Sequence, residues 1–180
     1  KQELGSVGYK DNQRVLVILF GTLEFDGRVK RMVELLQGVG TVTLVDLVAD
    51  TKVVTGSVKG VSRISINVSE HSHFKFANHL RLWIVSVKQV LRLKPRVVVA
   101  ENYFTCFPAW VSAKLTRSKL IYDAYELIIP EPGLKMGLRN LFWYILERWV
   151  VKRCDLVVAA NRERARLMAE HYDLKSSPEF

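Results

Sequence analysis

The sequence predicts an α/β fold: a Rossmann-like three-layer αβα sandwich around a mostly parallel sheet of about six strands. Three observations predict it. Short runs such as residues 14–20 and 96–100 are aliphatic or β-branched almost throughout, which is typical of strands covered on both faces. Longer segments between these runs carry apolar residues at helical spacing. Strand and helix alternate along the chain, which favours crossover connections between parallel strands.

The expected strands and helices cover most of the sequence. Strands are expected over residues 14–20, 41–46, 63–68, 96–100, 119–123 and 155–160. Helices are expected over residues 28–37, 74–94, 108–116, 134–152 and 162–172. Gly38 and Gly40 are expected to end the first helix, because glycine is favoured where a helix stops.

The chain of 180 residues is expected to form one domain over residues 14–174. Residues 1–13 are polar and are expected to be disordered or extended. Residues 175–180 contain Ser-Ser-Pro and are expected to begin an interdomain linker. We therefore expect a second domain beyond this chain.

The net charge of +9 implies an anionic partner: nucleic acid, acidic lipid or a phosphorylated substrate. Nucleic acid is not expected, because no RNP, KH or helix-turn-helix signature appears and the cations lie on predicted helices. The sequence also lacks a run of roughly 18 apolar residues, so no transmembrane helix is expected.

The first loop, residues 21–27, does not match a dinucleotide-binding loop. It lacks the GxGxxG pattern, and its acids Glu24 and Asp26 would repel a pyrophosphate. Binding of NAD or FAD is therefore not expected. An alternative for Asp26 is that it caps the helix that follows it.

The cysteines and histidines do not predict a metal site. Cys106 and Cys154 lie far apart without a CxxC motif, and we expect two reduced core thiols in a cytosolic protein. The His71-Ser72-His73 segment lacks the further ligands that a metal ion would need.

Several short phrases in the sequence occur in a characteristic order. They are KPR at 94–96, LIYD at 120–123 followed by Glu126, LE at 146–147 and CDLVVAA at 154–160. Together with the opening GTLEFDGRVKRMVELL, they resemble the N-terminal domain of family 4 glycosyltransferases of the GT-B fold. The resemblance covers residues 14–174 and depends on the order and spacing of the phrases.

The resemblance implies a retaining glycosyltransferase that uses a nucleotide sugar and no obligatory metal. It implies that this N-terminal domain binds the acceptor, a glycan or lipid-linked sugar, and that a C-terminal domain binds the donor. Polysaccharide or glycolipid synthesis in the cytoplasm, at the membrane face, is the expected setting. The donor-side catalytic groups belong to the other domain, so this chain alone is expected to hold no cofactor and to be inactive.

Candidate binding residues follow the ends of the expected strands, where ligands meet open α/β sheets. Aromatic rings can stack on a sugar and carboxylates can accept its hydroxyl groups. Tyr125 is expected to face the donor; the family has histidine there, and a phenol can donate a hydrogen bond without carrying positive charge. The expected acceptor-binding residues are Asp26, Arg28, Asn102, Tyr103 and Glu126.

Helices 74–94 and 134–152 combine cations with aromatic side chains. They could lie against an anionic bilayer, or their charges could form a solvated outer face above apolar stripes that cover the sheet. The residues expected to face a membrane are Lys75, Arg81, Trp83, Lys88 and Arg92. An alternative function is a non-catalytic subunit that docks on a membrane or recruits a separate catalytic chain.

Overall fold

The computed structural model describes residues 13–49, 60–68, 75–130 and 135–180. Of the segment 1–13, only Gln13 lies within this part, as the first residue of a strand. The side chain of Lys75, one of the expected membrane-facing residues, lies outside the described part.

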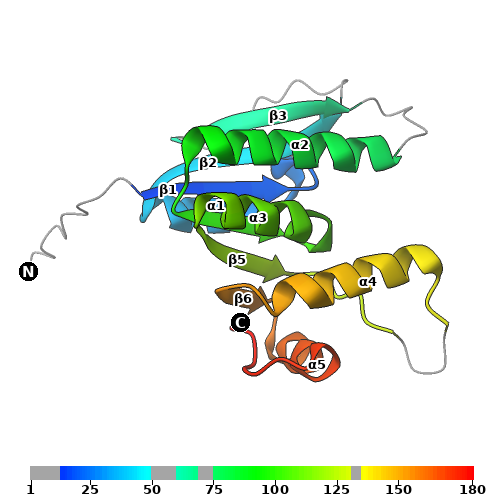
Figure 1. The fold of residues 1–180 in the computed structure, drawn as a ribbon. Coiled ribbons are helices and arrows are strands. Elements are labelled where there is room, and N and C mark those ends of the chain that lie inside the picture. The colour runs from blue at the N-terminus through cyan, green and yellow to red at the C-terminus, as the bar shows by residue number, and fades with distance from the viewer. Residues whose placement is uncertain (1–12, 50–59, 69–74, 131–134) are drawn as a thin grey trace, which may run out of the picture.

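Six parallel strands form a single sheet in the order β3-β2-β1-β4-β5-β6 (Figure 1). The strands are β1 (Gln13–Leu19), β2 (Gly40–Ala49), β3 (Ser62–Val68), β4 (Val97–Glu101), β5 (Lys119–Ala124) and β6 (Leu156–Ala159). This confirms the predicted Rossmann-like fold. The strand order reverses between β1 and β4, so the crevice that such sheets use for ligands lies beside these two strands.

Helices cover both faces of the sheet (Figure 1). On one face α1 (Gly27–Gln37) packs Val29 and Val33 against β1 and β2. The opposite face carries α2 (Lys75–Leu93), α3 (Tyr103–Thr116) and α4 (Leu138–Val151), which lie side by side and bury the larger core. The short helix η1 (Leu23–Phe25) precedes α1, and α5 (Arg162–Tyr172) follows β6.

Helix α3 begins at Tyr103, five residues before the expected start, and places Pro108 in its interior. A proline there has no N–H to donate to the carbonyl group of Phe104, which normally leaves that oxygen unsatisfied. The indole Nε1 of Trp83 on α2 donates to the Phe104 oxygen instead, at 3.2 Å. This bond between two helices explains why the proline does not end α3.

Gly40 does not end α1, as had been expected, but begins β2. A Cβ atom at this position would lie 1.8 Å from the backbone oxygen of Gln13 in β1, so the close approach of the two strands requires glycine. Gly38 is the C-cap of α1, as predicted, and donates its N–H to the carbonyl groups of Leu35 and Leu36.

A buried carboxyl group joins three elements near the β6 edge. Glu147 of α4 is fully buried and accepts hydrogen bonds from the hydroxyl groups of Tyr122 on β5 and Tyr172 on α5, the latter at 2.5 Å. Burial raises the pKa of Glu147 to about 7, against the opposing effect of the two hydroxyl donors. The network fixes α4 and α5 relative to the sheet.

Cys106 is buried, Cys154 is half-buried, and both thiols are free. Burial raises the pKa of both thiols, which disfavours the reactive thiolate.

At the C-terminus, Glu179 pairs with β6 through a hydrogen bond from the Ala159 N–H to the Glu179 carbonyl oxygen at 2.7 Å. The described helices include none with the length and apolar character needed to cross a membrane.

Candidate functional site

Polar side chains gather where the carboxyl ends of β1, β4 and β5 meet, next to the reversal of strand order. They come from the loop before α1 and the first turn of that helix, from the ends of β4 and β5 with the residues that follow them, and from the first turn of α5. Ligands bind at this edge in open α/β sheets. We call the group the switch-point cluster; its members are Asp26, Arg28, Glu101, Asn102, Asp123, Tyr125 and Arg164.

Asp26 is the N-cap of α1. Its Oδ1 accepts hydrogen bonds from the backbone N–H groups of Arg28 at 3.1 Å and Val29 at 3.0 Å. Such a cap stabilises a helix by about 0.5–2 kcal/mol. The alternative structural role for Asp26 is therefore confirmed, and contact with an acceptor stays a prediction. The cap also fixes the turn from which Arg28 extends toward the sheet.

Arg28 is the cation at the centre of the cluster. Its Nη2 atom forms an ion pair with Asp123 Oδ1, and the two side chains are 27% and 6% exposed. Its guanidinium carbon lies 5.3 Å from the centre of the Tyr125 ring. Burial lowers the pKa of Arg28, and the nearby charge of Glu101 acts in the opposite direction. Nη1 of Arg28 is buried without a hydrogen-bond partner among the described residues.

Glu101 is the last residue of β4 and is fully buried. Neither of its carboxyl oxygens has a hydrogen-bond partner within the described part of the chain. Burial raises the pKa of Glu101 to about 8, whereas the charge of Arg28 alone would lower it. A buried, unpaired acid with a perturbed pKa at a ligand-binding edge is typical of functional sites.

Asn102 connects β4 to α3 in a strained conformation. Its φ of 68° and ψ of 171° lie in a region that is occupied almost only by glycine and costs about 1–3 kcal/mol. Two hydrogen bonds hold it there: its side chain accepts from Phe104 N–H at 3.1 Å, and its N–H donates to the Asp123 carbonyl at 3.1 Å. Strain of this kind concentrates at functional sites.

Tyr103 and Glu126 lie beside the cluster. The ring of Tyr103 is half-buried, with its centre 4.1 Å from that of Phe104 and 6.1 Å from that of Trp143. Burial raises the pKa of Tyr103, and the exposed Glu126 adds to this effect through its charge. The structure therefore places all six predicted strand-end residues at one edge of the sheet. Their roles toward a ligand stay predictions.

Three members of the cluster were not among the predicted binding residues. Glu101 was expected only to follow the strand over residues 96–100, and Asp123 only to end the strand over residues 119–123 and the LIYD phrase. Arg164 donates a hydrogen bond to the backbone oxygen of Tyr125 across the α5 terminus. The alternation of side chains along β4 could have identified Glu101. Val97 and Val99 contact the core under α1, and Glu101 lies on the same face of the strand.

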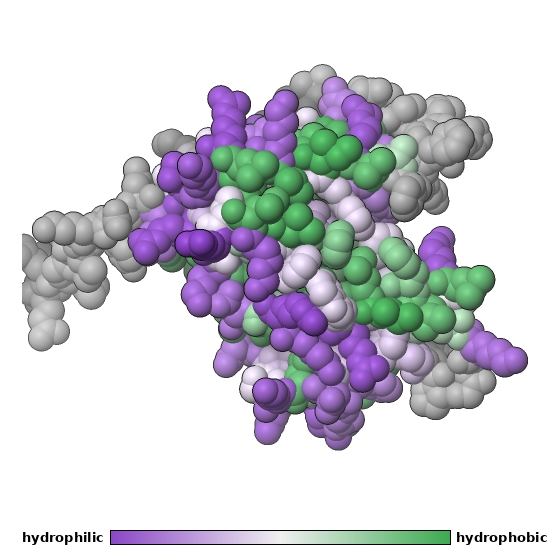
Figure 2. Space-filling model, viewed as in Figure 1, coloured by the Kyte–Doolittle hydropathy of each residue, from purple (hydrophilic) through white to green (hydrophobic). Residues whose placement is uncertain are grey.

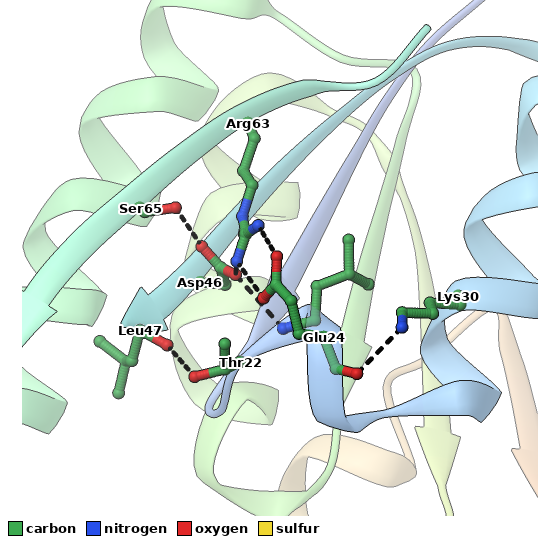
Figure 3. Close-up of polar contacts among 8 residues, drawn as sticks. Thr22, Glu24, Lys30, Asp46, Leu47, Arg63 and Ser65 are labelled. Carbon is green, nitrogen blue, oxygen red and sulfur yellow. Dashed lines mark hydrogen bonds and ion pairs between the residues drawn. The ribbon is translucent and has the colours of Figure 1, made fainter. Parts of the chain in front are cut away.

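A second polar network fixes the loop before α1 (Figure 3). Arg63 of β3 bonds two carboxylates, Glu24 Oε2 at 2.8 Å from Nη2 and Asp46 Oδ2 at 3.0 Å from Nε. Ser65 donates to the other Asp46 oxygen at 2.8 Å, and Thr22 donates to a backbone oxygen of β2 at 2.7 Å. Arg63 lowers the pKa of Glu24. Because Arg63 pairs with Glu24 in this loop and with Asp46 on β2, the network holds the loop that carries Asp26 in place.

The outer surface of α2 combines exposed cations with an apolar groove. Arg81, Lys88 and Arg92 are exposed, and Arg81 donates to a backbone oxygen of β3 at 3.2 Å. Trp83, one of the expected membrane-facing residues, is half-buried and bonded to α3. The groove between α2 and α3 measures about 520 Å³ and is lined by Leu80, Trp83, Ile84, Val87, Leu91, Phe107, Pro108 and Val111, with Lys88 at its side.

Exposed apolar side chains continue from this groove onto α4. Figure 2 shows hydrophobic residues gathered over α2 and α3 and again along α4. We call this surface the α2–α4 face; its exposed large apolar residues are Leu80, Ile84, Leu91, Leu138, Leu141, Phe142, Ile145 and Trp149. It lies on the side of the sheet opposite α1 (Figure 1).

Comparison with protein families gives one match, to the family described as "Glycosyl transferase 4-like domain", over residues 29–177. The match covers most of the chain, including β2 to β6 and every member of the switch-point cluster except Asp26 and Arg28. No curated protein sequence matches the chain.

Solved structures with a similar fold are distant in sequence. A sucrose-phosphate synthase segment from Thermosynechococcus elongatus is 10% identical with a TM-score of 0.68, covering 93% of this chain and 87% of its own. An E. coli structure described as trehalose-6-phosphate bound with UDP-2-fluoro glucose is 14% identical with a TM-score of 0.57, covering 89% and 42%. UDP-GlcNAc 2-epimerase from Methanocaldococcus jannaschii is 11% identical with a TM-score of 0.54, covering 88% and 42%.

These TM-scores show a shared fold, and the presence of an epimerase beside a sucrose-phosphate synthase means that the fold alone does not set the reaction. The chain spans less than half the length of the E. coli structure and of the epimerase.

Proposed function

Because the chain belongs to the glycosyl transferase 4-like family, we propose that it is the acceptor-binding domain of a retaining glycosyltransferase acting in polysaccharide or glycolipid synthesis. The switch-point cluster is the observation that supports this proposal. It presents carboxylates, an amide and a phenol at the strand ends, which are groups that bind sugar hydroxyls. Its carboxylates Asp26 and Asp123 offset the charges of its two cations, Arg28 and Arg164, which disfavours a phosphate ligand.

The donor is proposed to be a nucleotide sugar held by a second domain. One similar structure is described as bound with UDP-2-fluoro glucose, which supports a nucleoside-diphosphate sugar as donor. In this proposal the present domain orients the acceptor hydroxyl and so contributes mainly proximity to the reaction. Tyr125, whose ring lies next to Arg28, would face the donor sugar across the cleft.

Tyr103 and Glu126 test the acceptor role in the whole enzyme. Tyr103→Ala removes a half-buried ring that can stack on a sugar, and Glu126→Ala removes an exposed carboxylate that can accept hydroxyl groups. Each change is expected to raise the KM for the acceptor about tenfold, because about 1.4 kcal/mol of binding is lost, and to leave the KM for the nucleotide sugar unchanged. Steady-state kinetics with each substrate varied in turn provides the measurement.

Two control variants sharpen this test. Tyr103→Phe keeps the ring and is expected to retain most acceptor affinity. Glu34→Ala removes an exposed acid from the outer side of α1 and is expected to have no effect. Unchanged acceptor kinetics in both Tyr103→Ala and Glu126→Ala would refute the acceptor role.

The α2–α4 face supports a peripheral membrane location for the enzyme. The only acidic residue on α2, α3 and α4 is Glu147, which is buried. Exposed cations surround the apolar residues of this face; they are Arg81, Lys88, Arg92, Lys114, Arg139 and Arg148. Apolar residues flanked by cations without opposing acids are typical of surfaces that bind anionic lipid reversibly. The same surface would serve a non-catalytic docking subunit.

Co-sedimentation with vesicles tests this location. The chain is expected to bind vesicles that contain phosphatidylserine more tightly than neutral phosphatidylcholine vesicles. Lys88→Glu combined with Arg92→Glu is expected to weaken that binding at least tenfold, since each cation near such a surface contributes about 1 kcal/mol. Arg166→Glu, an exposed change on α5, serves as the control. Equal binding to both kinds of vesicle would rule out the electrostatic contribution.

A further inference from the structure

Two buried polar groups of the switch-point cluster, one acidic and one basic, have no hydrogen-bond partners among the described residues. They are the carboxyl group of Glu101 and Nη1 of Arg28. We propose that they form a site for two neighbouring hydroxyl groups of a pyranose ring, one bound by Glu101 and the other by Arg28 Nη1. The proposal rests on the proposed function and names the ligand chemistry of that same site.

The orientation of Arg28 supports two separate contacts. A guanidinium group is planar and carries N–H donors on both terminal nitrogens. Asp123 binds Nη2, and the Asp26 cap fixes the backbone from which the side chain extends. Nη1 is thereby held as a buried donor, with the charge of Glu101 close by. One nitrogen positions the group and the other remains for a ligand.

The charges around the pair favour a neutral ligand over an anion. Asp26 and Asp123 both lie close to Arg28, so a phosphate group bound to Nη1 would approach two carboxylates that already offset the charge of Arg28. A hydroxyl group can donate to a carboxylate and accept from a guanidinium group, so it suits either member of the pair. A vicinal diol offers one such group to each.

Burial gives the contacts their strength. An unpaired polar group inside a protein costs about 1–3 kcal/mol, and a ligand that supplies the missing partner removes that cost. The raised pKa of Glu101 means that the carboxyl group carries a proton near neutral pH in the free chain. Arg28 lowers this pKa and Asp26 raises it. The pKa of Arg28 is in turn raised by Tyr125, in the loop after β5, and lowered by Arg164 on α5. Burial also raises the pKa of Tyr125, which keeps its hydroxyl group a neutral donor at the border of the pair.

NMR of the chain labelled with ¹³C at glutamate carboxyl carbons tests the proposal. The probes are the methyl pyranosides of glucose, galactose, mannose and N-acetylglucosamine, and inorganic phosphate as the anion. At least one pyranoside is expected to shift the Glu101 resonance, which is assigned by its loss in Glu101→Gln. The resonance of Glu147, buried on the other side of the sheet, is an internal control and is expected to stay unchanged.

Variants separate the two contacts. Glu101→Gln keeps the shape of the side chain but cannot ionise. At about pH 9, above the Glu101 pKa of about 8, it is expected to weaken pyranoside binding about tenfold or more, followed through the other shifted resonances. Arg28→Lys replaces the forked guanidinium group by a single ammonium group and is expected to weaken pyranoside binding similarly. If phosphate shifts the Glu101 resonance and no pyranoside does, the site binds anions and the proposal is wrong. If no probe shifts it, the pair is a closed structural contact and the proposal is likewise wrong.

Neither of those outcomes contradicts the acceptor role of the domain. That role is decided separately, by the acceptor kinetics of Tyr103→Ala and Glu126→Ala in the whole enzyme. If no pyranoside shifted the Glu101 resonance and both variants kept unchanged acceptor kinetics, the proposed function and the diol site would both be refuted.

Discussion

Replacing Glu147 by alanine is expected to destabilise the chain by about 3–5 kcal/mol. The change leaves the buried hydroxyl groups of Tyr122 and Tyr172 without their shared acceptor and opens a cavity between β5, α4 and α5. Each unsatisfied buried hydroxyl group costs about 1–3 kcal/mol, and the cavity adds to this. Urea unfolding followed by circular dichroism measures the free energy of unfolding.

Glu147→Gln is the matched control for this effect. Its amide can accept a hydrogen bond from one tyrosine and donate to the other, because a tyrosine hydroxyl group can act in either role. We expect a loss of about 1 kcal/mol or less. If Glu147→Ala and Glu147→Gln destabilised the chain equally, the contribution of the hydroxyl network would be refuted.

Replacing Arg28 by alanine is expected to destabilise the chain by about 2–3 kcal/mol near neutral pH. The change leaves Asp123, which is only 6% exposed, without its cation. The expected loss is below that for a fully buried pair, because Arg28 itself is 27% exposed and water screens part of the interaction.

The cost of Arg28→Ala is expected to grow with pH because of Glu101. The pKa of Glu101 is raised from 4.5 to about 8 in the folded chain, so the stability that its bound proton contributes is full below pH 4.5 and is lost as pH rises to about 8. Without Arg28 the folded pKa rises further, and the loss continues above that pH. Unfolding curves at about pH 7 and about pH 9 measure the difference.

Arg31→Ala is the control for Arg28→Ala. Arg31 lies on the same helix and is exposed, so its replacement removes the same charge and is expected to change stability by less than about 0.5 kcal/mol. A pH-independent effect of Arg28→Ala would contradict the coupling between Arg28 and Glu101.

The alternation of apolar runs and helical segments was sufficient to predict the fold, because a parallel sheet needs covered strands and crossover helices. The start of α3 could not be predicted this way. Pro108 indicated a helix beginning near it, but the bond from Trp83 that satisfies the Phe104 oxygen connects residues far apart in sequence. Gly40 was misassigned for a similar reason, since its contact with Gln13 lies across the sheet.

The location of the candidate site could be predicted because carboxyl ends of parallel strands meet at one edge. Its central pair could not. Arg28 and Asp123 lie 95 positions apart in the sequence, and the burial of Glu101 at the end of β4 arises only from tertiary packing. The strain at Asn102 is likewise visible only in the backbone; the sequence predicted this residue as acceptor-binding, and its residue type does not reveal its positive φ.

The most direct test of the central claim is transfer of a radiolabelled sugar from a nucleotide sugar to an acceptor, measured for this chain alone and for the same chain joined to its proposed donor-binding domain. The acceptor role predicts turnover only by the joined protein, because the donor nucleotide is bound by the other domain. Turnover by residues 1–180 alone would contradict the claim that this chain is the acceptor half of the enzyme.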